Sequence, residues 1–288
     1  MNLAEELLEA FSGFSTAHGQ TEVSQERTAG KQKAKSFIVR NPLTLELIEG
    51  HINGKKGVGA IPINEENKCK FGALDIDQYP LDHNKLVDKL AELKVPCIVC
   101  RSKSGGAHIF FFFKEWMNAG DFRDKAAEIS SALGHGRCEI FPKQEQILVE
   151  RGDVGNFINL PYFDSDQTLR YAILKKRTSY IEASLSEFIK QIHKVKTSPK
   201  DFLKLPIGGP VDLLPNYIPC LRTKLAIGVF EGERNRTLFH LGVFLQRLDP
   251  GNWKTKLEEH NMKDFNPPLS ASEVVAIQNT LELSLIHI

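Results

Sequence analysis

The sequence predicts an α+β fold followed by a small all-α C-terminal domain, and two observations support this prediction. Between residues 59 and 171, short apolar runs such as VGAIPI and CKFGALDID alternate with amphipathic segments such as LDHNKLVDKLAELK. Beyond residue 215 the apolar positions follow a helical period, most clearly in NRTLFHLGVFLQRL and SASEVVAIQNTLEL, with Asn235 and Ser270 as expected N-caps. Strands interleaved with helices and hairpins indicate a mixed or antiparallel sheet.

Composition changes along the chain predict its division into domains. Residues 13–34 are rich in Ser, Thr, Gly, Gln and Lys, which predicts a loop after a short first helix. The Pro- and Gly-rich stretch 206–215 predicts a linker. The expected parts are an N-terminal helix and loop, an α+β domain and a helical domain, over residues 1–35, 36–205 and 206–288.

The overall composition is that of an ordinary globular protein, with 41% hydrophobic and 25% charged residues. A net charge of +1 means that attraction to a polyanion must come from local patches. The acidic, amphipathic N-terminus and the lack of a long apolar run predict a cytoplasmic location and no membrane partner. The five cysteines do not form a disulfide pattern. Cys97 and Cys100 are spaced to lie on opposite faces of a strand, which favours two buried apolar residues over a zinc or redox site.

A pair of carboxylates ends the apolar run in FGALDIDQY, residues 71–79. Side chains alternate along a strand, so Asp75 and Asp77 should lie on the same face. Adjacent carboxylates repel each other and do not favour stability. Because Mg²⁺ and Mn²⁺ prefer carboxylate oxygens, the pair indicates a divalent-metal site, although D-x-D alone is a weak motif.

Three further segments place polar residues where apolar ones are expected. RSKSGGAHIFFFF, residues 101–113, has a glycine turn flanked by Arg, Lys, Ser and His, which suits phosphate oxygens or forms a simple basic hairpin. CEIFPKQ places Glu139 in an apolar strand, as a third acid or a surface residue. In GDVGNFINLPYF, Asn156 and Asn159 contact a ligand or form turn hydrogen bonds. Together these groups are what two-metal phosphoryl or nucleotidyl transfer requires.

Four segments, FGALDIDQY, RSKSGGAHIFFFF, EIFPKQ and GNFINLPYF, resemble the archaeo-eukaryotic primase superfamily in order and spacing. The resemblance is greatest to the primase-polymerase domains of phage primase-helicases and TOTE conflict systems, and it covers about residues 50–171. It implies an RRM-like core in which Asp75 and Asp77 bind two Mg²⁺ or Mn²⁺ ions, with Glu139 as the third acid. It also implies that His108 contacts the phosphates of the incoming nucleotide. The candidate residues for nucleotide binding are Arg101, Lys103, Ser104, Gly105, His108, Lys143, Gln144, Asn156 and Asn159.

The chain departs from the family pattern at two positions. The superfamily commonly has a serine two residues before the histidine, and here that position is Gly106, with Ser104 further upstream. The third acid is often aspartate, and here it is Glu139. The segment CLRTKLAIGVFEGERNRTLFHLGVFLQR resembles the C-terminal helical modules of phage primases. In it, Arg234 and Arg236 either contact the template or belong to a solvated helix start.

The resemblance implies a DNA primase-polymerase that joins and extends deoxy- or ribonucleoside triphosphates on a single-stranded DNA template. Because a helicase often follows in this family, the resemblance implies a helicase, fused or separate, as the partner. The sequence has no G-x-x-x-x-G-K-[ST] phosphate loop and is therefore not expected to be a motor by itself, and LELSLIHI ends like a truncated piece of a longer chain. If the protein is encoded by a phage, its location is the cytoplasm of the bacterial host. Tyr162 and Phe163 either stack on bases or belong to the core. The expected DNA contacts are Lys35, Arg40, Lys55, Lys56, Tyr79, Arg234 and Arg236.

Two other classes of function remain open from the sequence. One is another metal enzyme, such as a nuclease, which degrades DNA without nucleotides, or a nucleotide-sugar transferase, in which Glu139 and GNFINLP have no obvious place. The other is a replication-initiation module that binds DNA without catalysis and therefore tolerates Asp75→Ala. A nicking initiator normally has a His-hydrophobic-His metal motif, which this sequence lacks.

Overall fold

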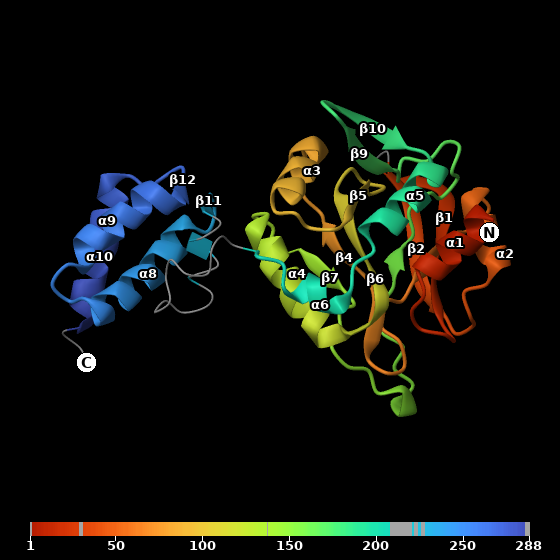
Figure 1. Ribbon diagram of the computed structural model, residues 1–288, viewed down its shortest axis with the longest axis horizontal. Coiled ribbons are helices and arrows are strands. Elements are labelled where there is room, and N and C mark those ends of the chain that lie inside the picture. The colour runs from red at the N-terminus through yellow and green to blue at the C-terminus, as the bar shows by residue number, and fades with distance from the viewer. Residues whose placement is uncertain are drawn as a thin grey trace. The chain divides into compact units, whose positions relative to one another are not determined.

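The computed structural model describes residues 2–28, 31–136, 138–207, 221, 224–225 and 228–285, without the side chains of 23–28, 31–34 and 283–285. The chain divides into two compact units (Figure 1). The first unit is Met1–Ala127 with Arg137–Leu205, and the second is Glu128–Gly136 with Pro206–Ile288. The expected linker lies outside the described residues from residue 208 onwards, as does the end of LELSLIHI.

A six-stranded antiparallel sheet forms the centre of the first unit, in the order β10-β9-β5-β6-β4-β7. Helix α3, His83–Glu92, connects β4 to β5, and α4, Ala119–Ala132, connects β6 to β7. The order β5-β6-β4-β7 with these two helices is the β-α-β-β-α-β arrangement of ferredoxin-like and RRM-like folds, so the predicted α+β core is confirmed. The strands are β4 Lys68–Ile76, β5 Ile98–Arg101, β6 Ala107–Asn118, β7 Glu139–Phe141, β9 Ala172–Lys176 and β10 Ser179–Ala183.

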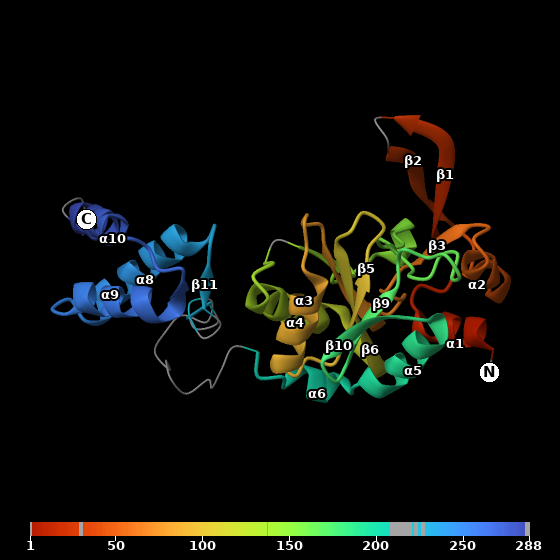
Figure 2. The same ribbon diagram turned by 90° about the horizontal axis from the view of Figure 1, so that it is seen from above.

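A second sheet has four strands in the order β2-β1-β3-β8. Its members are β1 His18–Thr28, β2 Lys31–Val39, β3 Gly57–Ala60 and β8 Ile158–Asn159. Strands β1 and β2 form a long hairpin that rises from the body of the first unit (Figure 2). The loop expected over residues 13–34 was therefore wrong for most of its length. The segment HGQTEVSQERT lacks the apolar alternation of a half-buried strand, and only its pairing with β2 shows that it is one.

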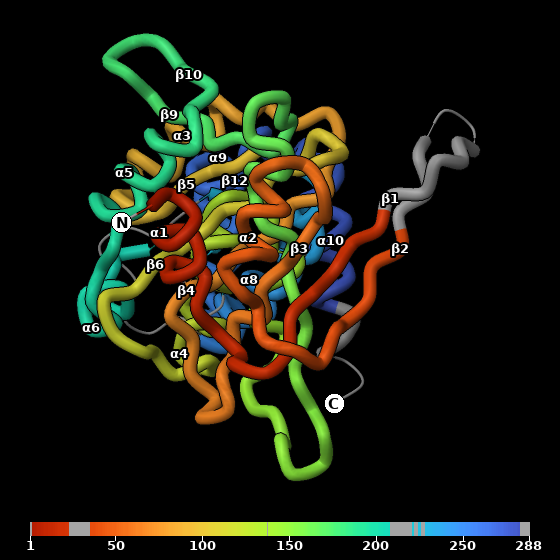
Figure 3. The backbone as a smooth tube through the Cα atoms, turned by 90° about the vertical axis from the view of Figure 1, so that its right-hand side faces the viewer, coloured from red at the N-terminus to blue at the C-terminus, as the bar shows by residue number. Residues whose placement is uncertain are grey.

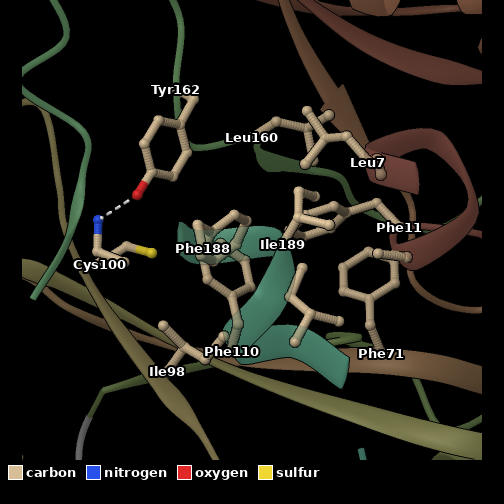
Figure 4. Close-up of a cluster of buried hydrophobic side chains, with 14 of the residues drawn as sticks. Leu7, Phe11, Phe71, Ile98, Cys100, Phe110, Leu160, Tyr162, Phe188 and Ile189 are labelled. Carbon is tan, nitrogen blue, oxygen red and sulfur yellow. Dashed lines mark hydrogen bonds between the residues drawn. The ribbon is translucent and has the colours of Figure 1, made fainter. Parts of the chain in front are cut away.

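Apolar packing on both faces of β6 explains its run of four phenylalanines. Phe110 and Phe112 point to one face, where they join a core with Phe71, helix α1 (Leu3–Ala10) and helix α5 (Leu185–Val195) (Figure 4). Phe111 and Phe113 point to the other face and contact rings from α4 and from α6 (Pro199–Leu203), with centroids 5.0 to 5.8 Å apart. A strand that is buried on both faces loses the alternation of a half-exposed one.

The remaining elements of the first unit frame this core. Helix α2, Leu45–Ile52, begins after Thr44, whose side chain accepts a hydrogen bond from the backbone N–H of Leu47. The β9–β10 hairpin and the chain between β7 and β8 project at opposite ends of the view in Figure 3. The latter segment contains the short 3₁₀ helix η1, Val149–Arg151.

The second unit is mainly helical, with α8 Arg234–Leu248, α9 Trp253–Asp264 and α10 Ala271–Leu285. One short parallel pair accompanies them, β11 Val229–Phe230 and β12 Phe265–Asn266. Ser270 caps α10 as predicted, because its hydroxyl accepts a hydrogen bond from the N–H of Glu273. The prediction for Asn235 was wrong, since α8 begins two residues earlier than expected, at Arg234, and Glu233 is its N-cap. None of the described helices combines the length and hydropathy needed to cross a membrane.

Candidate active site

The strand register brings three of the predicted residues into one row. Asp75 of β4 lies directly opposite His108 of β6 on one side and Glu139 of β7 on the other. Directly paired residues point to the same face of a sheet. That face carries Phe71 and Phe110 further along the same strands, so the row lies at the end of the buried core stripe. We call Cys100, His108, Asp75 and Glu139 the inner row.

Asp75 keeps one carboxylate oxygen without a hydrogen-bond partner inside the protein. Its Oδ1 is buried and accepts no hydrogen bond, and the nearest ring nitrogen, Nε2 of His108, is 3.4 Å away. Only 19% of the Asp75 side chain and 14% of the His108 side chain are exposed. A buried acceptor without a donor is costly, and a hard divalent cation supplies what this oxygen lacks.

The other two acids are each engaged by a neighbouring side chain. Asp77 lies just beyond the end of β4 and accepts a hydrogen bond from the Tyr79 hydroxyl at 2.9 Å. Glu139 forms an ion pair with Lys143, with 2.8 Å between Nζ and Oε1. Within the described ranges no three His, Cys, Asp or Glu side chains lie close enough together to hold a metal ion. The donor chemistry suits Mg²⁺ or Mn²⁺, and Tyr79 and Lys143 each engage one oxygen of the Asp77 and Glu139 carboxylates.

The glycine turn after β5 is closed by backbone hydrogen bonds. The N–H of Ser102 donates to the carbonyl of Gly106 at 2.8 Å, and the N–H of Gly105 donates to the carbonyl of Ser102 at 3.1 Å. A Cβ atom at Gly106 would lie 2.2 Å from the carbonyl oxygen of Ile76. Steric conflict with β4 therefore explains why glycine stands where the superfamily commonly has serine.

The predicted phosphate contacts within this segment are placed differently from one another. Ser104 is exposed and hydrogen-bonds to Tyr79. This hydrogen bond lowers the pKa of Tyr79, but burial and the neighbouring Asp77 raise it by more, so the pKa of Tyr79 lies above its ordinary value. Lys103 is exposed as a whole residue. The partial burial of its ammonium group, and to a smaller extent the positive charge of Arg170, lower its pKa. Arg101 follows Cys100, so it points to the opposite face of the sheet, and it donates to the carbonyl of Leu169 at 3.1 Å. The structure thus does not bring Arg101 to the face of Asp75.

The remaining predicted nucleotide contacts bind to other protein groups. Gln144 and Asn156 hydrogen-bond to each other, side chain to side chain and side chain to backbone. Asn159 accepts a hydrogen bond from Thr21 at 2.8 Å. It lies on the face of the four-stranded sheet opposite to Ile158, which belongs to the core shared with the six-stranded sheet. Asn159 is therefore not brought to the inner row.

The predicted template contacts are dispersed. Lys35, Lys55 and Lys56 are exposed, and they form no ion pair among the described residues. Arg40 donates to the carbonyl of Gly152 at 2.9 Å, and Tyr79 is 51% exposed beside Asp77.

The second-unit arginines have partners of their own. Arg234 is tied to the backbone, since it donates to the carbonyls of Pro267 and Pro268 at 2.9 and 3.3 Å. Arg236 lies 3.9 Å from Glu233 and is 62% exposed. Of these two, Arg236 is the side chain that remains accessible to a ligand.

The structure shows the surroundings of two aromatic residues and two cysteines whose roles had alternative interpretations from the sequence. Tyr162 belongs to the core (Figure 4). Its hydroxyl donates to the carbonyl of Ala183 and accepts from the N–H of Ala172. Phe163 is partly buried, with the Arg170 guanidinium 5.8 Å from its ring centre. Cys97 and Cys100 form no disulfide, and burial raises the pKa of the Cys97 thiol to about 12.

Comparison with known families agrees with this geometry. Residues 9–201 match the archaeo-eukaryotic primase domain of TOTE conflict systems. The chain belongs to this family. The match includes the whole inner row, the glycine turn and both sheets, whereas most of the helical second unit lies beyond it. No curated protein matches the chain. The predicted kinship is confirmed, and with it the assignment to a primase-type nucleotidyltransferase family.

Sequence reasoning missed two side chains beside this site, Ser102 and Arg170. Each has a buried polar atom without a hydrogen-bond partner, Oγ of Ser102 and Nη1 of Arg170. Ser102 stands inside the RSKSGG turn, where it resembles an ordinary turn residue. Arg170 follows a polar loop outside every motif, so no sequence signal marks it.

Proposed function

We propose that the protein is a metal-dependent primase-polymerase that joins nucleoside triphosphates on a single-stranded DNA template. The observation that carries this proposal is the inner row, in which Asp75 has a buried free oxygen between His108 and Glu139, with Asp77 two residues further on. The match to a primase family supports the same chemistry.

The carboxylates have distinct roles in this proposal. Asp75 holds a cation first, because its Oδ1 is already buried in the row and accepts no hydrogen bond. Asp77 and Glu139 join when they exchange Tyr79 and Lys143 for the cation. Bound Mg²⁺ or Mn²⁺ would activate the attacking hydroxyl and stabilise the charge on the pyrophosphate leaving group.

Two basic side chains beside the acids act on the phosphates. Lys143 is released when Glu139 takes a cation, and its ammonium group then neutralises phosphate charge. Nε2 of His108 lies on the same face as the acids and hydrogen-bonds to a phosphate oxygen. These roles require no change in the backbone of β4 or β6.

Single-stranded template is proposed to follow the exposed cations of the first unit. Lys55 and Lys56 lie in the turn between α2 and β3, and Lys35 lies on β2. Without acidic partners among the described residues, these ammonium groups are available to DNA phosphates. A helicase is the proposed partner, because duplex DNA must be opened before a primase can use it as a template.

The test is an incorporation assay with the full chain, single-stranded DNA, labelled nucleotides and Mg²⁺ or Mn²⁺, with and without a primer. The wild-type protein should form products on unprimed template. The variant Asp75→Asn/Asp77→Asn should form none, with a loss of at least about 10³-fold. A matched control is Asp121→Asn/Asp124→Asn, which neutralises two exposed acids of α4 and should keep full activity.

Other outcomes would assign a different function. Extension only from a primer would indicate a polymerase that does not initiate. Degradation of DNA without nucleotides, lost in the Asp75→Asn/Asp77→Asn variant, would indicate a nuclease. Equal DNA binding by wild type and variant without any product would contradict the catalytic proposal and favour a binding module.

A further inference from the structure

A cleft lies on the face of the six-stranded sheet opposite to the inner row. It has a volume of about 410 Å³ and lies between the first turn of α3 and the β9–β10 hairpin, which are neighbours in Figure 1. Arg101 is on this face because it follows Cys100 in β5. Since Cys100 pairs with Ala172, Tyr171 stands directly opposite Arg101. We call this space the outer cleft, and the residues that decide its chemistry are His83, Arg101, Tyr171, Tyr180 and Glu182.

The two walls of the outer cleft are anchored by side chains of α3. At the start of the helix, Nε2 of His83 donates to the carbonyl of Gly106 at 2.9 Å. Further along the helix, Asp88 accepts hydrogen bonds from Nζ of Lys175 at 2.6 Å and from the hydroxyl of Tyr180. Helix and hairpin are therefore held on either side of the cleft before any ligand enters, which lowers the entropic cost of binding.

Two half-buried tyrosines line the outer cleft. Nζ of Lys175 lies 5.7 Å from the ring centre of Tyr180. Burial, together with a hydrogen bond to Glu182, raises the pKa of Tyr171, and the positive charge of Arg101 opposes this increase. The guanidinium of Arg101 and the carboxylate of Glu182 thus both lie near the hydroxyl of Tyr171, so a cation, an anion and two aromatic rings share one cleft.

Arg101 and Glu182 both keep hydrogen-bonding capacity for a ligand. Nη1 of Arg101 donates to the carbonyls of Leu169 and Ser102 at 3.1 and 3.3 Å, which positions the guanidinium. Its Nε and Nη2 donate to no acceptor among the described residues. Glu182 is exposed and forms no ion pair within the described part of the chain, and its hydrogen bond is to the hydroxyl of Tyr171. A guanidinium offers parallel donors, and a carboxylate offers several acceptor positions.

The balance of charge in the outer cleft favours a neutral ligand. The charges of Arg101 and Glu182 oppose each other, and a second acid, Asp82, is engaged by the backbone N–H of Lys85 at 3.1 Å and lies 3.7 Å from its ammonium group. An ion of either sign would be attracted by one of these groups and repelled by another. A flat neutral ring with donors and acceptors on its edges satisfies both groups and also stacks on a tyrosine.

A nucleobase has this combination of properties, and guanine fits the two groups best. Guanine has two neighbouring acceptors, O6 and N7, which suit the paired donors of an arginine. Next to them it has two donors, N1–H and the N2 amino group, which suit a carboxylate. Adenine, cytosine and thymine each lack one of these two pairs.

We propose that the outer cleft binds a guanine base between Arg101 and Glu182, stacked on Tyr180. Strand β9 separates β5 from β10, so the two backbones lie roughly 10 Å apart and both side chains can reach one purine ring. The site lies on the other face of the sheet from Asp75, so this inference goes beyond the proposed function and does not depend on it. The base belongs to a free nucleotide or to a single strand of nucleic acid, since both present the same ring.

Equilibrium dialysis of labelled guanosine against the full chain in EDTA tests this site. Guanosine has no phosphate and EDTA removes divalent cations, so neither can assist binding at the acids of the inner row. Guanosine should bind about tenfold more tightly than adenosine, cytidine or uridine. Glu182→Gln can still accept from Tyr171 but loses its charge and one acceptor, so it should bind guanosine about tenfold more weakly. The matched control Glu46→Gln, at an exposed acid of α2 outside the cleft, should bind as wild type does.

A pair of variants at Tyr180 isolates the contribution of the aromatic ring. Tyr180→Phe and Tyr180→Leu both lose the hydrogen bond to Asp88, but only the first keeps a ring on which a base can stack. Tyr180→Leu should therefore bind guanosine about tenfold more weakly than Tyr180→Phe. Thermal unfolding of each variant monitors folding, and Glu182→Gln, at an exposed position, should melt at the wild-type temperature.

Four results would overturn the inference. The first is no binding of guanosine at concentrations up to about 1 mM. The second is equal affinity of Glu182→Gln and Tyr180→Leu with their controls, and the third is guanosine binding no tighter than adenosine. The fourth is loss of guanosine binding in Asp75→Asn/Asp77→Asn, which would place the nucleoside at the acids instead.

The same experiments separate this inference from the proposed function. Guanosine binding by a wild-type protein that forms no product would support the outer cleft and contradict the proposed reaction, and product formation without this binding would do the reverse. Competition identifies the source of the base. Displacement of guanosine by oligothymidylate that carries one guanine, but not by GTP in EDTA, would assign the site to a single strand, and the opposite result would assign it to a free nucleotide.

Discussion

Replacing Gly106 with alanine or serine should destabilise the protein, even though serine is the common residue of the superfamily there. The added Cβ atom would lie 2.2 Å from the carbonyl oxygen of Ile76, whereas ordinary contacts begin near 3.4 Å. A backbone atom cannot rotate away, so β4 and the glycine turn must separate by about 1 Å. The Gly106 carbonyl also accepts hydrogen bonds from the Ser102 N–H at 2.8 Å and from Nε2 of His83 at 2.9 Å.

The expected cost combines overpacking with a weakened hydrogen bond. Overpacking that moves the backbone costs about 1–3 kcal/mol, and one strained hydrogen bond costs about 1 kcal/mol. We therefore expect Gly106→Ala to lower the free energy of unfolding by about 2–4 kcal/mol. In a domain of this size the melting temperature should fall by roughly 10 °C. Urea denaturation followed by circular dichroism measures the first quantity, and differential scanning fluorimetry measures the second.

The control is the same substitution at a glycine with open space. Gly50 lies inside α2, and a Cβ atom there would meet nothing within 4 Å. Gly50→Ala should therefore stabilise the protein by up to about 1 kcal/mol through helix propensity. If Gly106→Ala proves as stable as wild type while Gly50→Ala behaves as expected, the steric explanation for the missing serine is refuted.

Three further predictions concern stability and metal binding. Burial lowers the pKa of His51 to about 4, so the folded state stays neutral where the unfolded state takes up a proton, and stability should fall by about 2 kcal/mol between pH 7 and pH 5. Urea titrations at the two pH values should show a smaller fall in His51→Gln. At tenfold its dissociation constant, Mg²⁺ or Mn²⁺ should stabilise wild type by about 1.4 kcal/mol but not Asp75→Asn/Asp77→Asn, which a cation titration of the melting temperature would show. Tyr162→Phe removes hydrogen bonds of 2.8 and 3.0 Å and should lower the free energy of unfolding by about 1–3 kcal/mol, whereas an unchanged value in urea titrations would contradict the core role of the hydroxyl.

The sequence predicted the strands and helices whose apolar pattern is strong. The core strands β4 and β6 and the helices α3, α8 and α10 all overlap the segments expected for them, with ends that differ by up to a few residues. The β1–β2 hairpin was missed because its polar sequence has no apolar period, and its strands are recognisable only from their pairing. The start of α8 was misplaced by two residues, since Asn235 is a good capping residue but Glu233 occupies that position.

The sequence predicted only part of the candidate site, because alternation along one strand can be read locally but the pairing of distant strands cannot. Period-two alternation is local, so it placed Asp75 and Asp77 on one face from the sequence alone. The same alternation places Arg101 and Cys100 on opposite faces of the sheet. The prediction of a basic glycine turn had nevertheless grouped Arg101 with the phosphate contacts. Glu139 was proposed as the third acid from its motif, and only the register of β7 against β4 makes it a direct neighbour of Asp75.

The sequence by itself determined the chemistry of this protein: two acids at a strand end, a histidine after a glycine turn, and a family resemblance that the domain match confirms. The tertiary structure decided which groups share the site. Ser102 and Arg170 carry no motif, and the pairing of β5 with β9, about 70 residues apart in the chain, brings the segments that hold them to neighbouring strands. Hydrogen-bonded pairing between distant segments is not encoded in local periodicity, so their unused donors become visible only in the folded protein.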